Sequence, residues 1–309
     1  MSLSIVSTLY QSAAYIDELY HRITDTALRL AEDYEIILVN DGSPDDSLDR
    51  AVQLSELDDH VSVVDLSRNF GEHKAIMTGL AHTRGDLVFI IESDLEEEPE
   101  WLLRFAEQLR RERCDVVYGI QDKRKGGLFE RWSGTWFYRL FRLFAGMELP
   151  ENMVTARLMT RRYVDALLQF EDREVFLFGL LYITGFAQQP HVVHKHSSSK
   201  TTYTLRRKIS LAITSITLFS NAPLIAIFYI GAIISFAACI CIACLVVNRM
   251  LFSGTLSGWA SLMASLWLIG GMVISCVGVV GIYLSKTFSE TKRRPLTIVR
   301  QIYGKRRNG

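Results

Sequence analysis

The residues LVFIIESD, Leu87–Asp94, indicate the fold of the first two thirds of this chain. An apolar, β-favouring run ends directly in two carboxylates, as a buried strand of a parallel sheet does beside a ligand site. Similar runs occur at residues 3–9, 35–40, 61–66 and 115–119, separated by helical patterns at about residues 16–32, 47–55, 74–84 and 100–113. Alternation of this kind predicts an α/β domain with a mostly parallel sheet and helices on both faces.

Glu92 and Asp94 are two residues apart, so on an extended strand their side chains point the same way. Hard carboxylate oxygens in this arrangement suit Mg²⁺ or Mn²⁺. A cation held there would clamp a diphosphate and neutralise charge on a departing nucleotide, with no proton transfer from the protein. Because acidic residues also cap helices, the triplet alone is weak evidence. Its place after an apolar strand, with Asp41 at the end of a second strand, favours the metal interpretation.

Two long stretches without charge, Ala222–Val247 and Trp259–Ser285, follow the α/β region. At about 1.5 Å per residue in a helix, each exceeds the roughly 30 Å hydrocarbon core of a bilayer. The alternative is a hydrophobic hairpin in a soluble core, which a chain of 309 residues could hardly cover on all sides. We therefore expect two transmembrane helices.

The balance of charge differs between the two parts of the chain. Residues 1–205 hold 33 of the 34 acidic residues and 22 of the 34 basic ones, whereas residues 206–309 hold only Glu290 against 12 basic residues. Basic clusters flank the apolar stretches, and the positive-inside bias places them in the cytosol. The N-terminus lacks the basic region of a signal peptide. We expect a multi-pass inner (plasma) membrane protein with both termini and the catalytic domain in the cytosol.

The segment before the first apolar stretch has the pattern of an amphipathic helix lying on the inner leaflet. The alternative is that the first span simply starts early. We expect a cytosolic domain at 1–205, an interfacial amphipathic helix at 206–220, a two-helix transmembrane hairpin at 221–286 and a basic cytosolic tail at 287–309. Membrane lipid is an expected partner and nucleic acid is not, while the surface of two spans is compatible with a homo-oligomer.

Several short motifs occur in a fixed order along the chain, and together they are more specific than any one of them alone. They are VNDGS at Val39–Ser43, LSRNFG at Leu66–Gly71, ESDLEEEP at Glu92–Pro99, DVVYG at Asp115–Gly119 and RLM at Arg157–Met159. With two apolar spans after them, they resemble the family-two glycosyltransferases of the polyprenyl-phosphate type, such as dolichol-phosphate mannose synthase and bacterial undecaprenyl-phosphate glycosyltransferases. The resemblance implies a GT-A (Rossmann-like) nucleotide-sugar-binding domain. It also implies inverting transfer of one sugar to polyprenyl phosphate on the cytosolic leaflet.

The resemblance also implies roles for individual residues. A nucleotide-sugar donor would contact Asp41, Ser93, Arg124 and Lys200; the metal would contact Glu92, Asp94 and Glu96; the acceptor phosphate would contact Arg157, Arg206 and Arg207. We expect Asp94 and Arg157 to carry catalysis. Glu92 stands where the family usually has aspartate, and Glu96 stands where glutamine is common. The alternative for Arg124 and Lys200 is a solvated surface charge.

One departure from the family pattern concerns the catalytic base. The family commonly has Gly-Asp-Phe before Arg-Leu-Met, whereas this chain has Val154-Thr155-Ala156, and Thr155 cannot act as a base. A phosphate monoester is already largely anionic at neutral pH, so positioning and charge stabilisation could suffice. The planar fork of Arg157 suits phosphate oxygens. The alternative is that Asp172 or Glu174 supplies a base.

Two other functions stay open from the sequence. A processive polysaccharide synthase normally shows Gln-x-x-Arg-Trp, but here Leu128 stands at the glutamine position before Arg131-Trp132. A non-catalytic lipid-carrier binding or flipping partner is conceivable because of Glu92 and Thr155. Metal-dependent release of nucleotide diphosphate would separate an enzyme from a pure binder.

Overall fold

The computed structural model describes residues 2–121, 152–195 and 258–304, and parts of 224–240. The chain divides into two units. One comprises Met1–Thr135, Leu149–Tyr203 and Arg294–Gly309, and the other comprises Trp136–Glu148 and Thr204–Arg293. The first unit contains the sheet and the candidate site, and the second contains the apolar helix.

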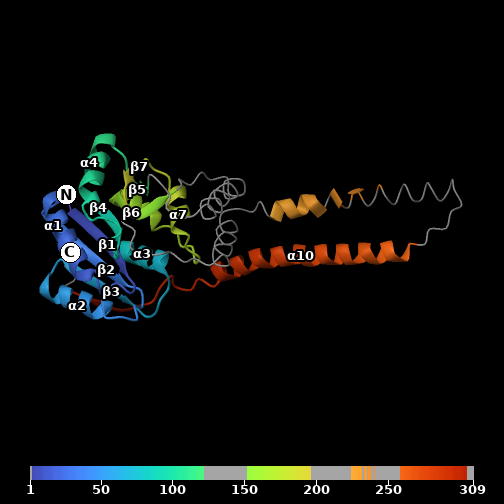
Figure 1. The fold of residues 1–309 in the computed structure, drawn as a ribbon, viewed down its shortest axis with the longest axis horizontal. Coiled ribbons are helices and arrows are strands. Elements are labelled where there is room, and N and C mark those ends of the chain that lie inside the picture. Colours follow the sequence, from blue (N-terminus) through green and yellow to red (C-terminus); the bar gives the residue numbers. More distant parts are fainter. Residues whose placement is uncertain are drawn as a thin grey trace. The chain divides into compact units, whose positions relative to one another are not determined.

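The first unit is built on a mixed sheet of eight described strands in the order β7-β5-β6-β4-β1-β2-β3-β8 (Figure 1). The strands are β1 (Ser2–Leu9), β2 (Asp33–Asn40), β3 (Val61–Leu66), β4 (Leu87–Glu92), β5 (Val116–Gln121), β6 (Met153–Thr160), β7 (Gln188–Val193) and β8 (Val299–Tyr303). Strands β4, β1, β2 and β3 are parallel neighbours, as predicted. β6 runs antiparallel between β4 and β5, and β8 runs antiparallel to β3. All five runs predicted from the sequence are strands.

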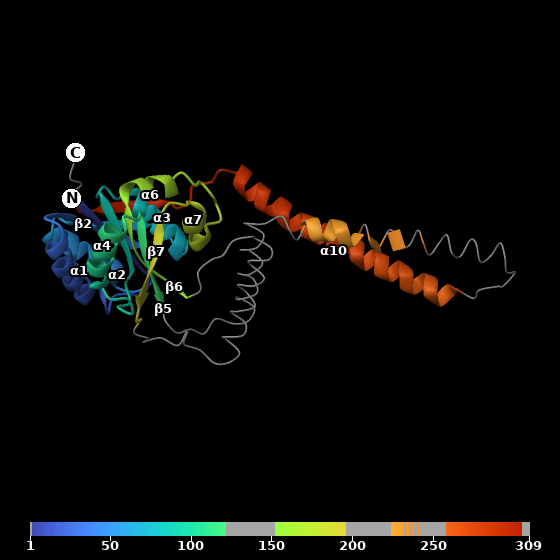
Figure 2. The same ribbon diagram turned by 90° about the horizontal axis from the view of Figure 1, so that it is seen from above.

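Helices cover both faces of this sheet. They are α1 (Ile16–Leu30), α2 (Ser47–Leu57), α3 (Glu72–Ala81), α4 (Trp101–Glu112), α6 (Arg161–Leu167) and α7 (Leu177–Ile183). Helices α1, α2 and α4 pack on one face, where their buried residues join one apolar core with β1 and β2. Helices α3, α6 and α7 lie on the other face (Figure 2). There α3 packs closely against β1. A Cβ at Gly79 would lie 2.5 Å from a methyl carbon of Val6, so this close packing requires glycine.

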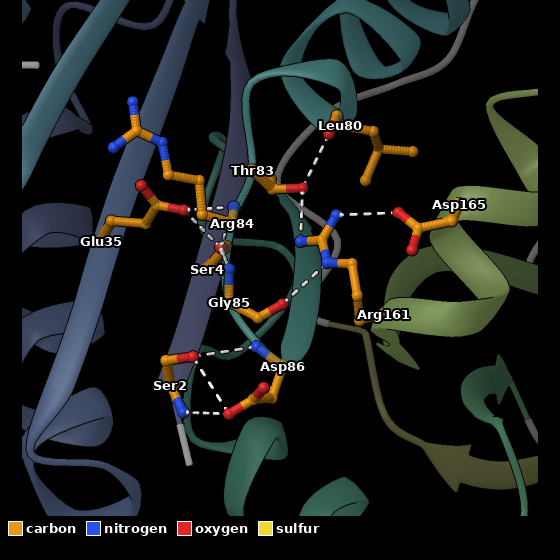
Figure 3. Close-up of polar contacts among 10 residues, drawn as sticks. All are labelled: Ser2, Ser4, Glu35, Leu80, Thr83, Arg84, Gly85, Asp86, Arg161 and Asp165. Atoms are coloured by element: carbon orange, nitrogen blue, oxygen red, sulfur yellow. Dashed lines mark hydrogen bonds and ion pairs between the residues drawn. The ribbon is translucent and has the colours of Figure 1, made fainter. Parts of the chain in front are cut away.

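The amino ends of the strands are closed by a polar network (Figure 3). The hydroxyl of Ser4 donates to Glu35 (2.5 Å) and accepts the backbone N–H of Gly85 (2.7 Å). Glu35 also accepts the backbone N–H of Arg84 (2.7 Å). Gly85 is required here, since a Cβ at this position would lie 2.6 Å from the backbone nitrogen of Ser4. The turn into β4 is therefore fixed against β1.

Part of the predicted basic tail at 287–309 belongs to the sheet. Helix α10 (Trp259–Thr291) continues beyond residue 286, and the chain then forms β8 beside β3. Arg300 of β8 donates to the carboxylate of Asp65 (3.1 Å) and to the backbone carbonyl of Ser67 (2.7 Å). The sequence signal was hidden because a half-exposed edge strand has no continuous apolar run and basic residues flank it. These residues complete the sheet.

Helix α10 contains the second apolar stretch. Its segment Leu268–Thr291 contains an 18-residue window with a mean hydropathy of 2.1, and none of that window is buried within the structure. It is the one helix among the described residues that is long and apolar enough to cross a membrane. Most of the first predicted span lies outside the described residues, so the two-span topology stays a prediction.

Candidate active site

The carboxyl ends of β1, β2 and β4 meet at one edge of the sheet, where Leu9 pairs with Asn40 and Thr8 pairs with Glu92. Asp41 follows β2 and is 2% exposed. Its carboxylate accepts the backbone N–H groups of Phe70 (2.7 Å) and Gly71 (3.0 Å). Burial raises the pKa of Asp41, and these two hydrogen bonds partly oppose the shift. The side chain thus fixes the loop that leads into α3, and its contact with a nucleotide stays a prediction.

Glu92 ends β4 with both carboxylate oxygens engaged. One accepts the hydroxyl of Thr155 (2.6 Å), and the other pairs with the ammonium of Lys195 (2.5 Å). Glu97 is fully buried beneath them and accepts the backbone N–H groups of Glu92 (3.2 Å) and Thr155 (2.9 Å). These bonds tie the end of β4 to β6 and to the segment after β7.

We call Glu72, Glu92, Asp94, Glu96 and Glu97 the acidic cluster. Burial, together with the nearby charge of Glu92, raises the pKa of Glu72 to about 7. The same two causes raise the pKa of Glu97 well above its usual range. Among the described residues both ion pairs of the cluster are made by Lys195, at 2.5 Å from Glu92 and 3.4 Å from Glu96. Within the described residues Lys195 pairs with two of the five acidic side chains, and Asp94 makes no ion pair.

Asp94 is the member of the cluster best placed to meet a cation. One of its oxygens accepts the backbone N–H of Glu96 (3.0 Å), and the other has no hydrogen bond in the described structure. Burial raises the pKa of Asp94, and the charge of Glu92 adds to the effect. No group of three or more His, Cys, Asp or Glu side chains is arranged to hold a metal within residues 2–121, 152–195 and 258–304. A magnesium site needs only one or two carboxylates when substrate phosphates complete it, so the residues present fit such an ion.

Ser93 lies between the two carboxylates but turns the other way. Its hydroxyl is buried and lies 2.7 Å from the hydroxyl of Ser12, whose backbone N–H donates to Ser47 (2.9 Å). These bonds join the loops that follow β1, β2 and β4. The predicted contact of Ser93 with the donor stays a prediction.

Arg157 lies on β6 and lines a cavity of about 230 Å³ together with Tyr118, Phe178 and Phe186. It is 2% exposed, and its guanidinium donates to the backbone carbonyls of Thr155 (3.0 Å) and Val154 (3.1 Å). The guanidinium carbon also lies 5.5 Å from the centre of the Phe178 ring. Burial lowers the pKa of Arg157. The third guanidinium nitrogen, Nη1, makes no hydrogen bond in the described structure, which leaves a donor for an anion in the cavity.

Comparison of the sequence with known proteins shows its family. The model of Glycosyl transferase family 2 matches residues 4–168. This chain belongs to Glycosyl transferase family 2. It is 48% identical over 304 residues, 98% of this chain and 89% of the relative, to a protein of Mycobacterium tuberculosis (strain CDC 1551 / Oshkosh) named as a glycosyltransferase.

Two further likenesses are more distant. The prophage bactoprenol glucosyl transferase homolog of Escherichia coli (strain K12) is 28% identical over 304 residues, 98% of this chain and 99% of the relative. The structure of glucosyl-3-phosphoglycerate synthase from M. tuberculosis in complex with Mn²⁺, UDP and glucosyl-3-phosphoglycerate is 20% identical, with a TM-score of 0.46 over 70% of this chain and 77% of that one. At that TM-score the second likeness carries no inference about ligands.

As a member of family two, the chain is a glycosyltransferase with a GT-A-like mixed α/β sheet. The family resemblance read from the motifs is confirmed at this level, and the polyprenyl-phosphate type stays a prediction. Four predicted site residues, Arg124, Lys200, Arg206 and Arg207, lie outside the described residues. Asp172 and Glu174, the alternative bases, lie in the loop between α6 and α7, where Asp172 is exposed and Glu174 half-buried.

The sequence missed three residues of this family-two site. Glu97 was not separable from its acidic neighbours in ESDLEEEP, because nothing in a run of carboxylates tells which one is buried. Lys195 follows β7, a strand whose exposed residues give no clear alternation. Glu72 begins α3, where an acidic residue is expected for helix capping alone.

Proposed function

We propose that this family-two enzyme moves one sugar from a nucleotide-sugar donor to polyprenyl (undecaprenyl) phosphate on the cytosolic leaflet, with inversion at the anomeric carbon. The observation that carries the proposal is the cluster of acidic side chains at the carboxyl ends of β4 and its neighbours, in which Asp94 makes no ion pair with any described residue. Like charges this close are tolerated where a cation is bound during function.

The donor side of the reaction rests on Asp94 and Glu96. Their side chains would hold Mg²⁺ or Mn²⁺, with Asp94 offering its unshared oxygen. When bound, the ion supplies charge neutralisation on the departing nucleotide diphosphate. Asp41 would act beside it by holding the loop at Phe70 and Gly71 in place for the donor nucleotide.

The acceptor side rests on Arg157 and on the apolar helix. An anion in the cavity would meet the free Nη1 of Arg157 beside the rings of Tyr118 and Phe178, which suit an apolar group next to a phosphate. Arg206 and Arg207 would add charge at headgroup depth. The E. coli relative named as a bactoprenol glucosyl transferase homolog supports a lipid acceptor, as does the composition of α10.

No general base is required in this scheme. Thr155 donates its hydroxyl to Glu92 and serves to position that carboxylate. The acceptor phosphate is already largely anionic at neutral pH, so it can attack without losing a proton to the protein. Replacing Asp172 and Glu174 together with amides should therefore leave turnover unchanged, and a large loss would assign the base to one of them.

The test is mass spectrometry of the lipid after purified full-length protein is given undecaprenyl phosphate, Mn²⁺ and a panel of nucleotide sugars. We expect one donor to yield a lipid heavier by a single sugar, and Asp94→Asn to abolish this product while the melting temperature stays near that of the wild type. Asp86→Asn, an equivalent change at the other end of β4, is the matched control. Full turnover in Asp94→Asn, or no lipid product from any donor, would refute the proposal.

A further inference from the structure

The ammonium of Lys195 lies inside the acidic cluster. Its nitrogen is 2.5 Å from an oxygen of Glu92 and 3.4 Å from an oxygen of Glu96. The Lys195 side chain is only 16% exposed. A positive charge therefore already lies between two of the carboxylates that the motif assigns to the metal.

Lys195 is held there by a series of contacts across three segments of the fold. Glu97 accepts the backbone N–H of Thr155 (2.9 Å), Thr155 donates its hydroxyl to Glu92 (2.6 Å), and Glu92 pairs with Lys195. The series joins the loop after β4, strand β6 and the segment after β7. A lysine fixed in this way is not a mobile surface charge that happens to meet a carboxylate.

We propose that Lys195 is a resident counter-cation that shares Glu92 and Glu96 with the divalent ion and weakens metal binding in the absence of donor. The inference rests on the proposed function, because it places the metal at the acidic cluster. Two cations compete for the same carboxylate charge, and the largely buried ammonium would repel a divalent ion held by the same carboxylates. The arrival of a donor diphosphate adds negative charge that both cations attract. Metal and donor therefore bind together, and metal and nucleotide diphosphate leave together.

A positioning role of this kind differs from a purely structural ion pair in what its removal does to the metal. If Lys195 only stabilised the fold, its loss would lower the melting temperature and leave metal affinity unchanged or weaker. If Lys195 competes with the metal, its loss removes one positive charge from beside Glu92 and Glu96, and Mn²⁺ binds more tightly. The direction of the change in affinity separates the two.

The experiment measures Mn²⁺ binding to the full-length protein in lipid nanodiscs by electron paramagnetic resonance, with Mn²⁺ as the only added ligand. We expect Lys195→Met to bind Mn²⁺ at least tenfold more tightly than the wild type, and Lys195→Arg to bind like the wild type. Arg50→Met, which removes the exposed ion pair with Asp17, is the matched control and should change nothing. Adding Asp94→Asn to Lys195→Met should abolish the gain, which places the tighter site at the cluster.

Lys195→Gln provides a second variant, since glutamine removes the charge but can still donate to Glu92. It replaces the methionine variant if that protein does not fold, and the same tightening is expected. Equal or weaker Mn²⁺ binding in the folded variant would overturn the inference. Failure of the proposed function can be distinguished from failure of this inference. If the Lys195 variants bind Mn²⁺ more tightly but the wild type forms no lipid product, the proposed acceptor is refuted. If the wild type forms the product but the variants bind Mn²⁺ as the wild type does, only the role of Lys195 is refuted.

Discussion

The amino ends and the carboxyl ends of the strands both carry polar clusters, but the charges in them are arranged differently. At the amino ends each charged group has a fixed partner. Arg161 donates to the backbone carbonyl of Gly85 (3.0 Å) and to the hydroxyl of Thr83 (2.9 Å), and it lies 3.6 Å from Asp165 (Figure 3). Asp86 accepts the backbone N–H of Ser2 (2.8 Å), and this bond lowers the pKa of Asp86.

At the carboxyl ends the acidic cluster has raised pKa values instead, because burial and neighbouring carboxylates disfavour the charged form. At the amino ends the hydrogen bonds and the ion pair within the fold stabilise the charged groups. The cluster at the carboxyl ends would be stabilised by the cation that we propose it binds. Two polar clusters on one sheet thus differ in the direction of their pKa shifts, and we expect the one at the carboxyl ends to be the functional one.

The two ends of β4 should differ most in how a substitution changes turnover. Asp94→Asn should raise the activation barrier by about 3 kcal/mol or more, because it removes the carboxylate oxygen that we expect to bind the metal. Turnover should therefore fall roughly a hundredfold or more. Asp86→Asn should leave turnover unchanged, since the amide oxygen can still accept the bond from Ser2. Steady-state transfer assays on both variants measure the difference. Equal losses would mean that the two ends do not differ in role.

The next effect is on stability at the amino ends. Gly85→Ala introduces a Cβ 2.6 Å from the backbone nitrogen of Ser4 and 2.7 Å from the carbonyl carbon of Leu3. Because backbone atoms cannot move aside cheaply, we expect a loss of about 1–3 kcal/mol in the free energy of unfolding. Gly271→Ala in α10 is the control, because among the described residues no atom outside the helix's own nearby backbone lies within 4 Å of the new Cβ. Thermal denaturation should show a lower melting temperature for Gly85→Ala alone, while Mn²⁺ binding per folded molecule stays constant.

Thr155→Val tests the contact that holds Glu92 at the carboxyl ends. Valine keeps the shape but removes the hydroxyl that donates to the carboxylate (2.6 Å). We expect about 1.5–3 kcal/mol of lost stability, the usual range for a hydrogen bond to a charged group. The activation barrier for transfer should rise by more than the free energy of unfolding falls, because Glu92 then holds Lys195 less firmly. Denaturant melts and transfer rates on the same preparations give the two numbers.

The smallest effect is expected for Asp165→Asn. Asp165 lies 3.6 Å from Arg161 and its side chain is 60% exposed. Exposed pairs of this kind contribute less than about 0.5 kcal/mol, so both stability and turnover should match the wild type. A larger loss in a melting experiment would show that the balance of charge at the amino ends matters more than its hydrogen bonds.

The sequence predicts the amino-terminal half of this fold well, because its strands are buried on both faces and read as unbroken apolar runs. Leu87–Ile91 is such a run, and the carboxylates after it could be placed at a strand end from the pattern alone. Lys195 could not be placed, since its contact with Glu92 joins residues that are 103 positions apart. Strand β8 was missed for the same reason, because its partner β3 lies far earlier in the chain and is separated from it by α10.

Strand β8 has a consequence for how the protein is made. The sheet begins with Ser2–Leu9 but receives its outer strand from Val299–Tyr303, so translation must pass through α10 before β3 gains its last partner. During synthesis β3 exposes unpaired backbone groups and the carboxylate of Asp65 lacks Arg300. The edge of β3 therefore stays unpaired until α10 and the residues after it have been synthesised.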